Sequence, residues 1–348
     1  MSPLRTELRP GYSISRIIKG GWQLAGGHGS FDRRQAVTDM LTFIDNGITT
    51  FDCADIYTGV EAMIGEAVKE LQQRDSFNTD EHIQVHTKLV PDLDKLTTIT
   101  HDQIEAIIDR SLARLNLERL HLVQFYWWDM ALGDPLESLE VLKNLQRKGK
   151  IRYLGCTNWN QHTMQRFTDE DFDLVSAQVQ YSLLDQRAKG RFSDWCAANS
   201  LQLLCYGVLA GGFLTSHWLS KPDPGFDFEN RSLIKYRLII EDFGGWDLFQ
   251  QLLHVLHTIG QEHGVPLSTV ATRFMMDQSG VAAVIIGARS AAHIGDTLSA
   301  VNLELTSANR CTIDNILQQR KGPEGLVYEL EGDRNGPHGR IMKYNLNA

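Results

Sequence analysis

Three side chains suited to proton transfer lie near the predicted ends of two neighbouring strands. Asp52 ends a β-branched run at residues 48–52, and Tyr57 follows it in the loop before the next helical pattern. Lys88 lies near the end of an alternating run at residues 83–89, which is typical of a strand. A carboxylate, a phenol and an ammonium in one pocket can form a tuned general acid or base, which hydride transfer to a carbonyl requires.

The charges in this group determine what we expect of the phenol. A phenol ordinarily has a pKa near 10 and is a poor acid at neutral pH, and an adjacent ammonium such as Lys88 stabilises the phenolate and lowers that pKa. A buried lysine tends to lose its proton, and a carboxylate such as Asp52 keeps it charged. Each residue alone has an ordinary explanation as a turn, surface or packing residue. Their combination at matching strand ends is what indicates chemistry.

Strand and helix patterns alternate along most of the chain about every 30 residues, which is typical of parallel strands joined by helical crossovers. Eight strands of this kind are enough to close a (β/α)8 TIM barrel. A doubly wound open sheet is the alternative, but the sequence lacks the strand–GxGxxG–helix unit that binds dinucleotides in that fold. The strand-like runs are centred near residues 17, 50, 85, 123, 154, 176, 204 and 284.

In such a barrel the C-terminal ends of all strands converge on one mouth, where active sites lie. Helix-start signals support the division into strands and helices, because Thr100 with Gln103 forms a capping pattern and Pro135 suits a first helical position. The residues expected at the mouth are Gly21, Trp22, Asp52, Lys88, Tyr126, Thr157, Asn158, Gln178, Tyr206 and Gly287.

Two segments show no clear period. Residues 207–245 form a long predicted loop after the seventh strand, and a loop of that length in a compact barrel is usually a lid or a binding loop. Residues beyond Gly322 predict an extended tail laid over the barrel. We therefore expect one domain spanning residues 1–348, with a core at about residues 15–320 and a tail at 321–348.

Composition narrows the class of protein. The 348 residues are 42% hydrophobic and 22% charged, values typical of a globular protein with a sizeable core. The formal net charge of −9 argues against nucleic acid or an anionic membrane as the main partner. The sequence contains no run of about 18 apolar residues that predicts a membrane span, and its first residues lack the apolar stretch of a signal peptide.

The cysteines favour neither a disulfide framework nor a metal site. They are odd in number and widely scattered, without zinc-ligand spacing. Four of them lie in apolar runs and are expected to be small core residues. We therefore expect a reduced, cytoplasmic protein that acts on a small molecule, of undetermined oligomeric state. The five are Cys53, Cys156, Cys196, Cys205 and Cys311.

Several short motifs occur in order between roughly residues 15 and 305. The first is Asp52-x-Ala54-Asp55-x-Tyr57-x-Gly59-x-Glu61, followed by Ile64-Gly65. The others are Val85-His86-Thr87-Lys88, Gly155-Cys156-Thr157-Asn158-Trp159, Gln178-Val179-Gln180-Tyr181-Ser182-Leu183, Tyr206-Gly207-Val208-Leu209-Ala210-Gly211-Gly212 and Ile286-Gly287-Ala288-Arg289. In their order and spacing these motifs resemble the aldo-keto reductase superfamily.

The resemblance implies a (β/α)8 barrel that binds a nicotinamide dinucleotide in extended form, without a Rossmann domain. By position, Tyr57 would be the proton donor, Lys88 the residue that adjusts its pKa, and Asp52 the partner of Lys88. Thr157, Asn158 and Gln178 would hydrogen-bond the nicotinamide carboxamide, and Tyr206 would stack on its ring. The other implied cofactor residues are Gly21 and Trp22 at the mouth, Gly207, Val208, Leu209 and Gly211 along the pyrophosphate, and Gly287, Ala288, Arg289, His293, Asp296 and Thr297 at the adenosine end.

The chain departs from the family pattern at several places, among them Gly21, Thr58 and Val60 near the mouth. Tyr126 stands where typical members have a catalytic histidine, and a tyrosine can donate one hydrogen bond to a carbonyl oxygen but does not titrate near neutrality. His293 and Thr297 replace the usual residues at the adenosine end. Arg289 suits a 2′-phosphate through bidentate contacts, although it could also be a solvated strand-end arginine. The resemblance therefore implies NADP(H), with NAD(H) as the alternative.

Three functions fit the sequence. The leading one is an NADP(H)-dependent oxidoreductase that transfers a hydride between cofactor and a carbonyl or alcohol substrate, with Tyr57 as general acid/base and an aromatic pocket. The second, motivated by Tyr126, is a cofactor-binding regulatory or partner subunit of the same fold with little turnover. The third is a barrel that binds some other phosphorylated ligand.

Overall fold

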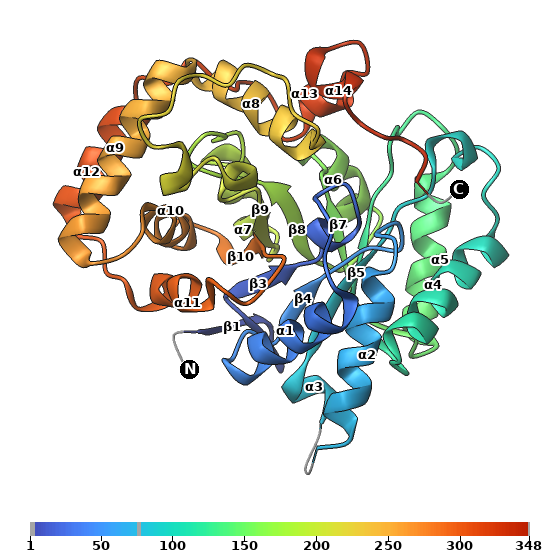
Figure 1. The fold of residues 1–348 in the computed structure, drawn as a ribbon. Helices are drawn as coiled ribbons and strands as arrows, with labels where there is room; N and C mark the ends of the chain where they lie inside the picture. Colours follow the sequence, from blue (N-terminus) through green and yellow to red (C-terminus); the bar gives the residue numbers. More distant parts are fainter. Residues whose placement is uncertain (1–3, 75–77, 347–348) are drawn as a thin grey trace.

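The computed structural model describes residues 4–74 and 78–346, within which eight parallel strands close into a barrel (Figure 1). The strands are β3 (Ile17–Gly20), β4 (Thr50–Asp52), β5 (Gln84–Leu89), β6 (Leu120–Phe125), β7 (Ile151–Thr157), β8 (Leu174–Gln180), β9 (Gln202–Tyr206) and β10 (Val281–Gly287). They pair in chain order, and β10 closes the ring against β3. The predicted barrel is confirmed, and the doubly wound open sheet is ruled out because no edge strand remains in this sheet.

Helices surround the barrel and connect its strands (Figure 1). Two begin where the sequence predicts. The Thr100 hydroxyl accepts from the Gln103 N–H at 3.3 Å while the Gln103 side chain accepts from the Thr100 N–H at 2.9 Å, and Pro135 is the first residue of α5. Such caps pair N–H groups that a helix start leaves free. The helices are α1 (Arg33–Asp45), α2 (Val60–Gln72), α3 (Thr79–His82), α4 (His101–Leu115), α5 (Pro135–Arg147), α6 (Gln161–Asp169), α7 (Arg191–Ala198), α9 (Trp246–His263), α10 (Leu267–Met276), α11 (Ile294–Asn302) and α12 (Ser307–Leu317).

A short antiparallel hairpin that the sequence reading missed packs against one end of the barrel. It consists of β1 (Arg5–Arg9) and β2 (Tyr12–Ser15). Leu8, Tyr12 and Ile14 are buried in one cluster with side chains of the barrel strands. Because β2 leads directly into the start of β3, this hairpin covers the N-terminal end and leaves the C-terminal mouth for a site. The barrel-strand members of the cluster are Ile18, Leu122, Val175, Leu204, Ala282, Ala283 and Ile285.

The interval 207–245 is not a single long loop. Its C-terminal part forms α8 (Arg231–Phe243), after two short 3-10 turns, η3 (Ala210–Gly212) and η4 (Ser216–Trp218). The prediction of an aperiodic segment is wrong there because Arg237 lies on the buried face of α8. Its guanidinium pairs with Asp223 at 2.6 Å and with Glu241 at 2.9 Å, so a charged residue occupies a place where the pattern calls for an apolar one.

The segment after α12 lies over the barrel, as the sequence predicts, and it covers the mouth, where Tyr328 and Tyr344 pack against Tyr126 and Trp128. Its path includes two four-residue helical turns, α13 (Glu329–Gly332) and α14 (Pro337–Arg340), seen beside α8 in Figure 1. α12 itself begins at Ser307, where the Thr306 side chain caps it. Farther along, the carbonyl oxygen of Tyr344 accepts from the Leu93 N–H at 2.9 Å. We refer to residues 320–346 as the tail.

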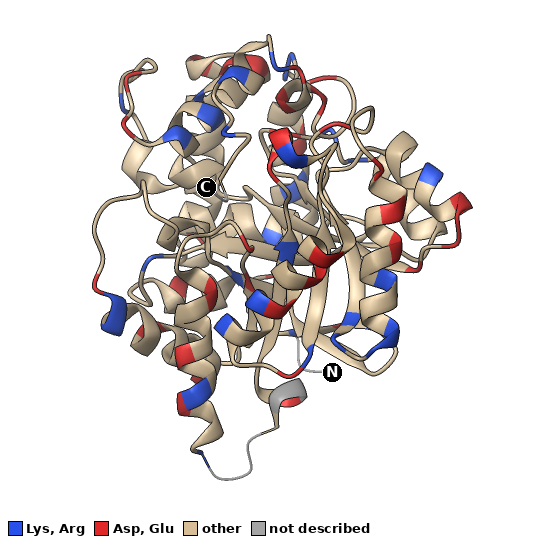
Figure 2. Cartoon of the chain, turned by 90° about the vertical axis from the view of Figure 1, so that its right-hand side faces the viewer, with Lys and Arg blue, Asp and Glu red and all other residues tan. Residues whose placement is uncertain are grey.

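Surface and core follow the expectations from composition. Cys53, Cys156, Cys196 and Cys205 are buried and free, whereas Cys311 is exposed, so four cysteines are core residues as predicted. Acidic and basic residues are interspersed along the helices on the side drawn in Figure 2. In the described parts of the chain, no helix is both long enough and apolar enough to cross a bilayer.

Candidate active site

The three predicted proton-transfer residues meet at the barrel mouth. Asp52 is the last residue of β4, and Lys88 is near the end of the adjacent strand β5. The Lys88 ammonium donates to Asp52 Oδ1 at 2.7 Å and to the Cys53 carbonyl oxygen at 2.7 Å. The same Nζ lies 5.1 Å from the centre of the Tyr57 ring. The spacing read from the sequence therefore brings a carboxylate, an ammonium and a phenol together.

The Asp52–Lys88 pair is buried, and each side chain compensates the charge of the other. Gln178 Nε2 also donates to Asp52 Oδ1, at 2.6 Å, and Gln124 Nε2 does so more weakly at 3.4 Å. Burial lowers the pKa of Lys88, but the Asp52 carboxylate and Tyr57 raise it more, so this pKa lies above its ordinary value. The prediction that Asp52 keeps the lysine charged is confirmed.

The Tyr57 phenol remains protonated at neutral pH in this structure. Burial raises the pKa of Tyr57 to about 12, although the Lys88 ammonium acts in the opposite direction. The predicted effect of Lys88 on the pKa of Tyr57 is correct, but the predicted lowering of that pKa is wrong, because desolvation outweighs the attraction of the ammonium. The Trp22 ring, 5.1 Å from the Tyr57 ring centre to centre, provides part of that desolvation. A protonated phenol beside a fixed ammonium is suited to giving up a proton.

Tyr126, which replaces the expected histidine, directly follows β6 and is enclosed by other aromatic rings. Its ring centre lies 4.8 Å from that of Trp128 and 6.0 Å from that of Tyr328 in the tail. Burial raises the pKa of Tyr126, and a hydrogen bond from Tyr328 only partly opposes this. Tyr126 therefore stays neutral and can act as a hydrogen-bond donor but not as a titrating acid near pH 7.

The residues assigned to the nicotinamide end also converge, and they connect to the proton-transfer group. The Thr157 hydroxyl donates to Gln178 Oε1 at 3.3 Å, and the amide nitrogen of Gln178 contacts Asp52. Tyr206 Oη donates to Asn158 Oδ1 at 2.7 Å. Asn158 has a left-handed backbone with φ 61°, a conformation that asparagine adopts more readily than most residues. These four side chains form one hydrogen-bonded edge of the mouth.

The predicted pyrophosphate segment forms the turn after β9. Gly207, Val208, Leu209 and Gly211 lie in it, and both glycines have positive φ values of 74° and 64°. Tyr236 of α8 packs directly on this turn: a Cβ on Gly207 would lie 2.5 Å from its Oη, and one on Gly211 would lie 2.7 Å from its ring. Only glycine allows this close approach.

The residues predicted for the adenosine end follow β10 and begin α11, at the neighbouring edge of the mouth. Arg289 donates to the His28 carbonyl oxygen at 2.7 Å and is exposed. His293 is 88% exposed in its side chain and lies 3.7 Å from Asp296, so these side chains face solvent. The full set is Gly287, Ala288, Arg289, His293, Asp296 and Thr297.

Gly21 and Trp22 lie between these two edges. The Gly21 N–H donates to the Asp52 carbonyl oxygen at 2.8 Å, and a Cβ on Gly21 would lie 2.7 Å from Val60 and 2.8 Å from that oxygen. Trp22 Nε1 donates to Ser232 Oγ of α8 at 3.0 Å. The residues predicted for proton transfer and for the nicotinamide end therefore meet at the C-terminal mouth, whereas the assignment of the adenosine-end residues to a cofactor stays a prediction.

Sequence reasoning missed several side chains at this mouth. Gln124, which contacts Asp52, is a polar residue inside the apolar run of β6. That break in the apolar pattern could have identified it as a candidate. Lys235 of α8 places its ammonium 5.1 Å from the centre of the Tyr206 ring and 5.9 Å from that of Tyr328. Lys235 and Tyr328 come from segments without a clear period, so nothing in the sequence pointed to them.

The tail is fixed to the mouth by a buried cluster of charges, also unforeseen. The Arg187 guanidinium donates to both carboxylate oxygens of Glu331 at 3.0 Å each, and to those of Asp185 at 2.9 and 2.7 Å. All three side chains are at most 2% exposed. This cluster holds α13, and with it Tyr328, over Tyr126.

Comparisons with known proteins agree with this geometry. The family model described as "Aldo/keto reductase family" matches residues 16–318. The chain is 26% identical over 335 residues to aldo-keto reductase YhdN of Bacillus subtilis, covering 91% of this chain and 95% of that protein. It is 23% identical to the NADH-specific methylglyoxal reductase of Escherichia coli, covering 85% and 93%.

Solved structures share the fold. The glycerol dehydrogenase AKR11B4 from Gluconobacter oxydans superposes with a TM-score of 0.75 at 24% identity, covering 93% of this chain and 98% of that one. An aldo-keto reductase from Klebsiella pneumoniae in complex with NADPH superposes with a TM-score of 0.66 at 22% identity, covering 90% and 95%. The match of the family model across most of the sequence, on a barrel whose mouth gathers Asp52, Tyr57 and Lys88, shows that the chain belongs to the aldo/keto reductase family.

Proposed function

We propose that the protein is an NADP(H)-dependent oxidoreductase that interconverts a carbonyl and an alcohol, with Tyr57 as the general acid and base. The observation that carries the proposal is the buried contact of Lys88 with Asp52 beside the Tyr57 ring. That arrangement supplies a proton where a carbonyl oxygen would gain negative charge. We also propose that barrel and tail act as one domain, because the buried Arg187 cluster joins them.

The residues have separate roles in the proposed reduction. NADPH supplies the hydride when bound. Tyr57 Oη gives its proton to the carbonyl oxygen, and the phenolate that remains is stabilised by the adjacent Lys88 ammonium. Asp52 keeps Lys88 charged and fixed, so little reorganisation is needed during the reaction. Tyr126 donates a hydrogen bond to the same carbonyl oxygen. In the reverse direction the phenolate takes the proton from the alcohol.

The mouth fits a nicotinamide dinucleotide. Asn158 and Thr157 offer polar groups for a carboxamide, and the Tyr206 face offers a surface for stacking. The glycine turn that includes Gly207 and Gly211 lets backbone approach a pyrophosphate closely. Arg289 would pair with a 2′-phosphate, which favours NADP(H). NAD(H) is the alternative, since one relative is named as NADH-specific.

We infer that the substrate binds in a small cavity beneath the tail, which adjoins Tyr126 but does not include Tyr57 in its lining. This cavity of about 130 Å³ lies among Tyr126, Trp128, Trp159 and Tyr328, about the volume that four or five waters occupy in the liquid. Trp159 Nε1 is buried without a hydrogen-bond partner, and such donors are rarely left unpaired. We propose a compact substrate with a hydrogen-bond acceptor besides the reacting carbonyl, rather than a long apolar one.

Cofactor titration followed by a turnover assay tests the proposal. Seven tryptophans, one of them beside Tyr57, should report binding by fluorescence quenching, and we expect NADPH to bind more tightly than NADH. Oxidation of NADPH is then followed with a panel of small carbonyl compounds, with polar and apolar members of matched size. If neither NADPH nor NADH binds, the proposed function is contradicted. Turnover of only long apolar carbonyls would contradict the proposed substrate class.

A regulatory subunit with little turnover is the second candidate, and the enclosure of Tyr126 by Tyr328 favours it. If the protein is an active reductase, Tyr126→Phe should lower kcat/KM about 10- to 100-fold, the range expected for one lost hydrogen bond to a reacting oxygen. Tyr126→His, which keeps a donor, should retain more activity than Tyr126→Phe. A wild-type protein that binds NADPH but turns over no carbonyl, with turnover appearing in Tyr126→His, would instead support the regulatory function.

A further inference from the structure

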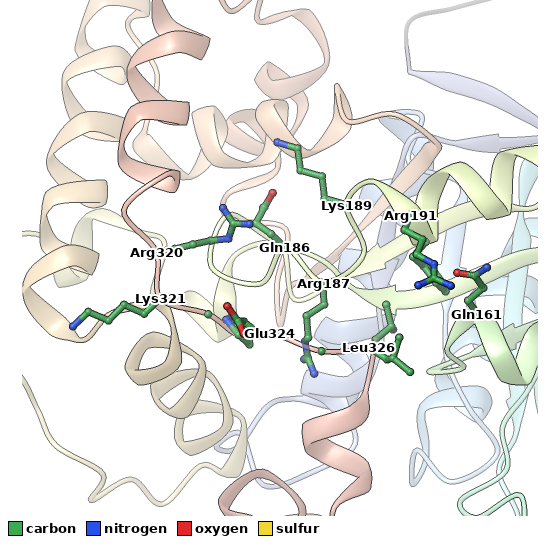
Figure 3. Close-up of a pocket in the computed structure, with 14 residues that line it drawn as sticks. Gln161, Gln186, Arg187, Lys189, Arg191, Arg320, Lys321, Glu324 and Leu326 are labelled. Atoms are coloured by element: carbon green, nitrogen blue, oxygen red, sulfur yellow. The ribbon is translucent and has the colours of Figure 1, made fainter.

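A second and larger cavity lies between the start of α7 and the first part of the tail (Figure 3). Its volume is about 670 Å³, enough for a small metabolite. None of the residues that line it belongs to the proposed catalytic or cofactor set. They are Gln161, Gln186, Arg187, Lys189, Arg191 and Phe192 on one side and Arg320, Lys321, Gly322, Pro323, Glu324, Gly325, Leu326 and Val327 on the other.

The lining of this cavity is basic, although the chain as a whole has a net charge of −9. Lys189, Arg191, Arg320 and Lys321 lie in it, and among the described residues none of them has an ion-pair partner. Glu324 is the only unpaired acid in the lining. Cations gathered in one concave surface repel one another and produce a positive potential, which an anion relieves.

The side chains do not contribute equally. Arg320 and Gln186 extend toward one another and Lys189 lies on the same side of the cavity, whereas Lys321 extends away (Figure 3). Arg191 lies at the start of α7. We therefore expect direct contacts from Lys189 and from Arg320, whose Nη1 also donates to the Leu317 carbonyl oxygen at 3.0 Å. Arg191, which lies beside Gln161 in Figure 3, and Lys321 add to the potential.

A buried polar atom without a partner also points to a ligand. Gln186 is 6% exposed, and its Nε2 donates to the Ser182 carbonyl oxygen at 2.5 Å. Its Oε1 is buried and accepts no hydrogen bond. Buried acceptors are seldom left unpaired, and a fully deprotonated oxyanion has no O–H to donate to this one. It calls for a ligand that also carries a hydroxyl or another donor.

We propose that this cavity binds a small phosphorylated compound with hydroxyl groups, of the sugar phosphate class. The planar fork of Arg320 suits two phosphate oxygens, and Lys189 and Arg191 supply further positive charge. Gln186 accepts from a ligand hydroxyl. The site is separate from the mouth, so its ligand is not the cofactor.

Occupancy of this cavity should affect the mouth through the tail. Leu326 and Val327 line the cavity and directly precede Tyr328, which packs on Tyr126. Arg187 lies in the wall and fixes Glu331. A ligand that holds residues 320–327 in place therefore stabilises the position of Tyr328.

Calorimetric titration of the full-length protein tests the proposal, with NADPH present in excess so that any phosphate site at the mouth is filled. The probes are glucose 6-phosphate, inorganic phosphate and glucose. We expect glucose 6-phosphate to bind with an affinity that falls with added salt, phosphate to bind more weakly, and glucose not to bind. Arg320→Gln and Lys189→Ala should each weaken glucose 6-phosphate binding at least about tenfold.

Two substitutions of exposed cations elsewhere, Arg34→Gln on α1 and Lys69→Ala on α2, are matched controls and should leave the affinity unchanged. Arg320 and Lys189 are exposed, so their variants should fold, and thermal melts check this. Absence of binding at millimolar glucose 6-phosphate overturns the proposal, as does binding that neither cavity variant weakens. Equal affinity for phosphate and glucose 6-phosphate overturns the assignment to a hydroxylated ligand. None of these outcomes depends on turnover.

Discussion

Tyr57→Phe should lower kcat for carbonyl reduction by about 10²- to 10⁴-fold, the range that general acid catalysis contributes. The substitution removes one hydroxyl and keeps the ring that packs on Trp22, so NADPH affinity should change little. The hydroxyl is hydrogen-bonded to the Lys88 ammonium, which stabilises the phenolate that proton transfer leaves. Tyr126 has no such interaction with Lys88 and should not replace it. Single-turnover measurement of NADPH oxidation separates this chemical step from cofactor release.

Tyr153→Phe is the matched control for that experiment, because Tyr153 lies on β7 and packs on Tyr12 of the hairpin with ring centres 4.8 Å apart. It should reduce carbonyls at the wild-type rate. Since the pKa of Tyr57 is about 12, the phenol stays protonated between about pH 6 and 9, and its ionisation should not appear in the rate profile there. Full activity of Tyr57→Phe would show that another group supplies the proton.

Glu331→Ala should release the tail from the mouth. The substitution leaves the Arg187 guanidinium buried with Asp185 as its remaining carboxylate, and breaking a buried pair in this way typically costs about 3–5 kcal/mol. We expect this cost to weaken the packing of residues 326–344 on the barrel. The amide hydrogens of that segment should therefore exchange faster. The melting temperature should fall, and kcat/KM should fall as well because Tyr328 no longer packs on Tyr126.

Two further variants test whether the charge of Glu331 is responsible for these effects. Glu331→Gln keeps the shape and some hydrogen bonding but removes the charge, so its effects should be intermediate. Glu118→Ala removes an exposed acid that pairs with no cation among the residues that the structure describes, and it should change neither exchange nor melting. If exchange in the tail of Glu331→Ala matches the wild type, the buried cluster is not what fixes the tail.

The parts of the fold that the sequence predicts are those with a regular period. Most helices bury one face and the barrel strands are buried along their length, so both leave a hydrophobic pattern in the sequence. The C-terminal ends of the parallel strands then locate the mouth. Asp52, Lys88 and Tyr57 could be placed together for that reason. The hairpin was missed because strands of four and five residues give too few alternations.

Other features depend on contacts that distant segments create. In the sequence Arg237 has the character of a surface residue, and its burial on α8 depends on the ion pair with Asp223. Lys235 lies near Tyr328 only because the tail packs on the mouth. The high pKa of Tyr57 has the same origin. A nearby lysine can be read from the sequence, but the extent of desolvation is a property of the assembled mouth.

The position of α8 has a consequence for the timing of catalysis. Ser232, near its start, accepts from Trp22 Nε1 at 3.0 Å and contacts His28 Nε2 at 3.1 Å, while Tyr236 rests on the glycine turn. The helix therefore connects the Trp22–His28 segment to the glycine turn across the mouth. If a dinucleotide binds between these segments, as proposed, its release would require the contacts of α8 to separate. The rate of cofactor exchange would then depend on the opening of α8.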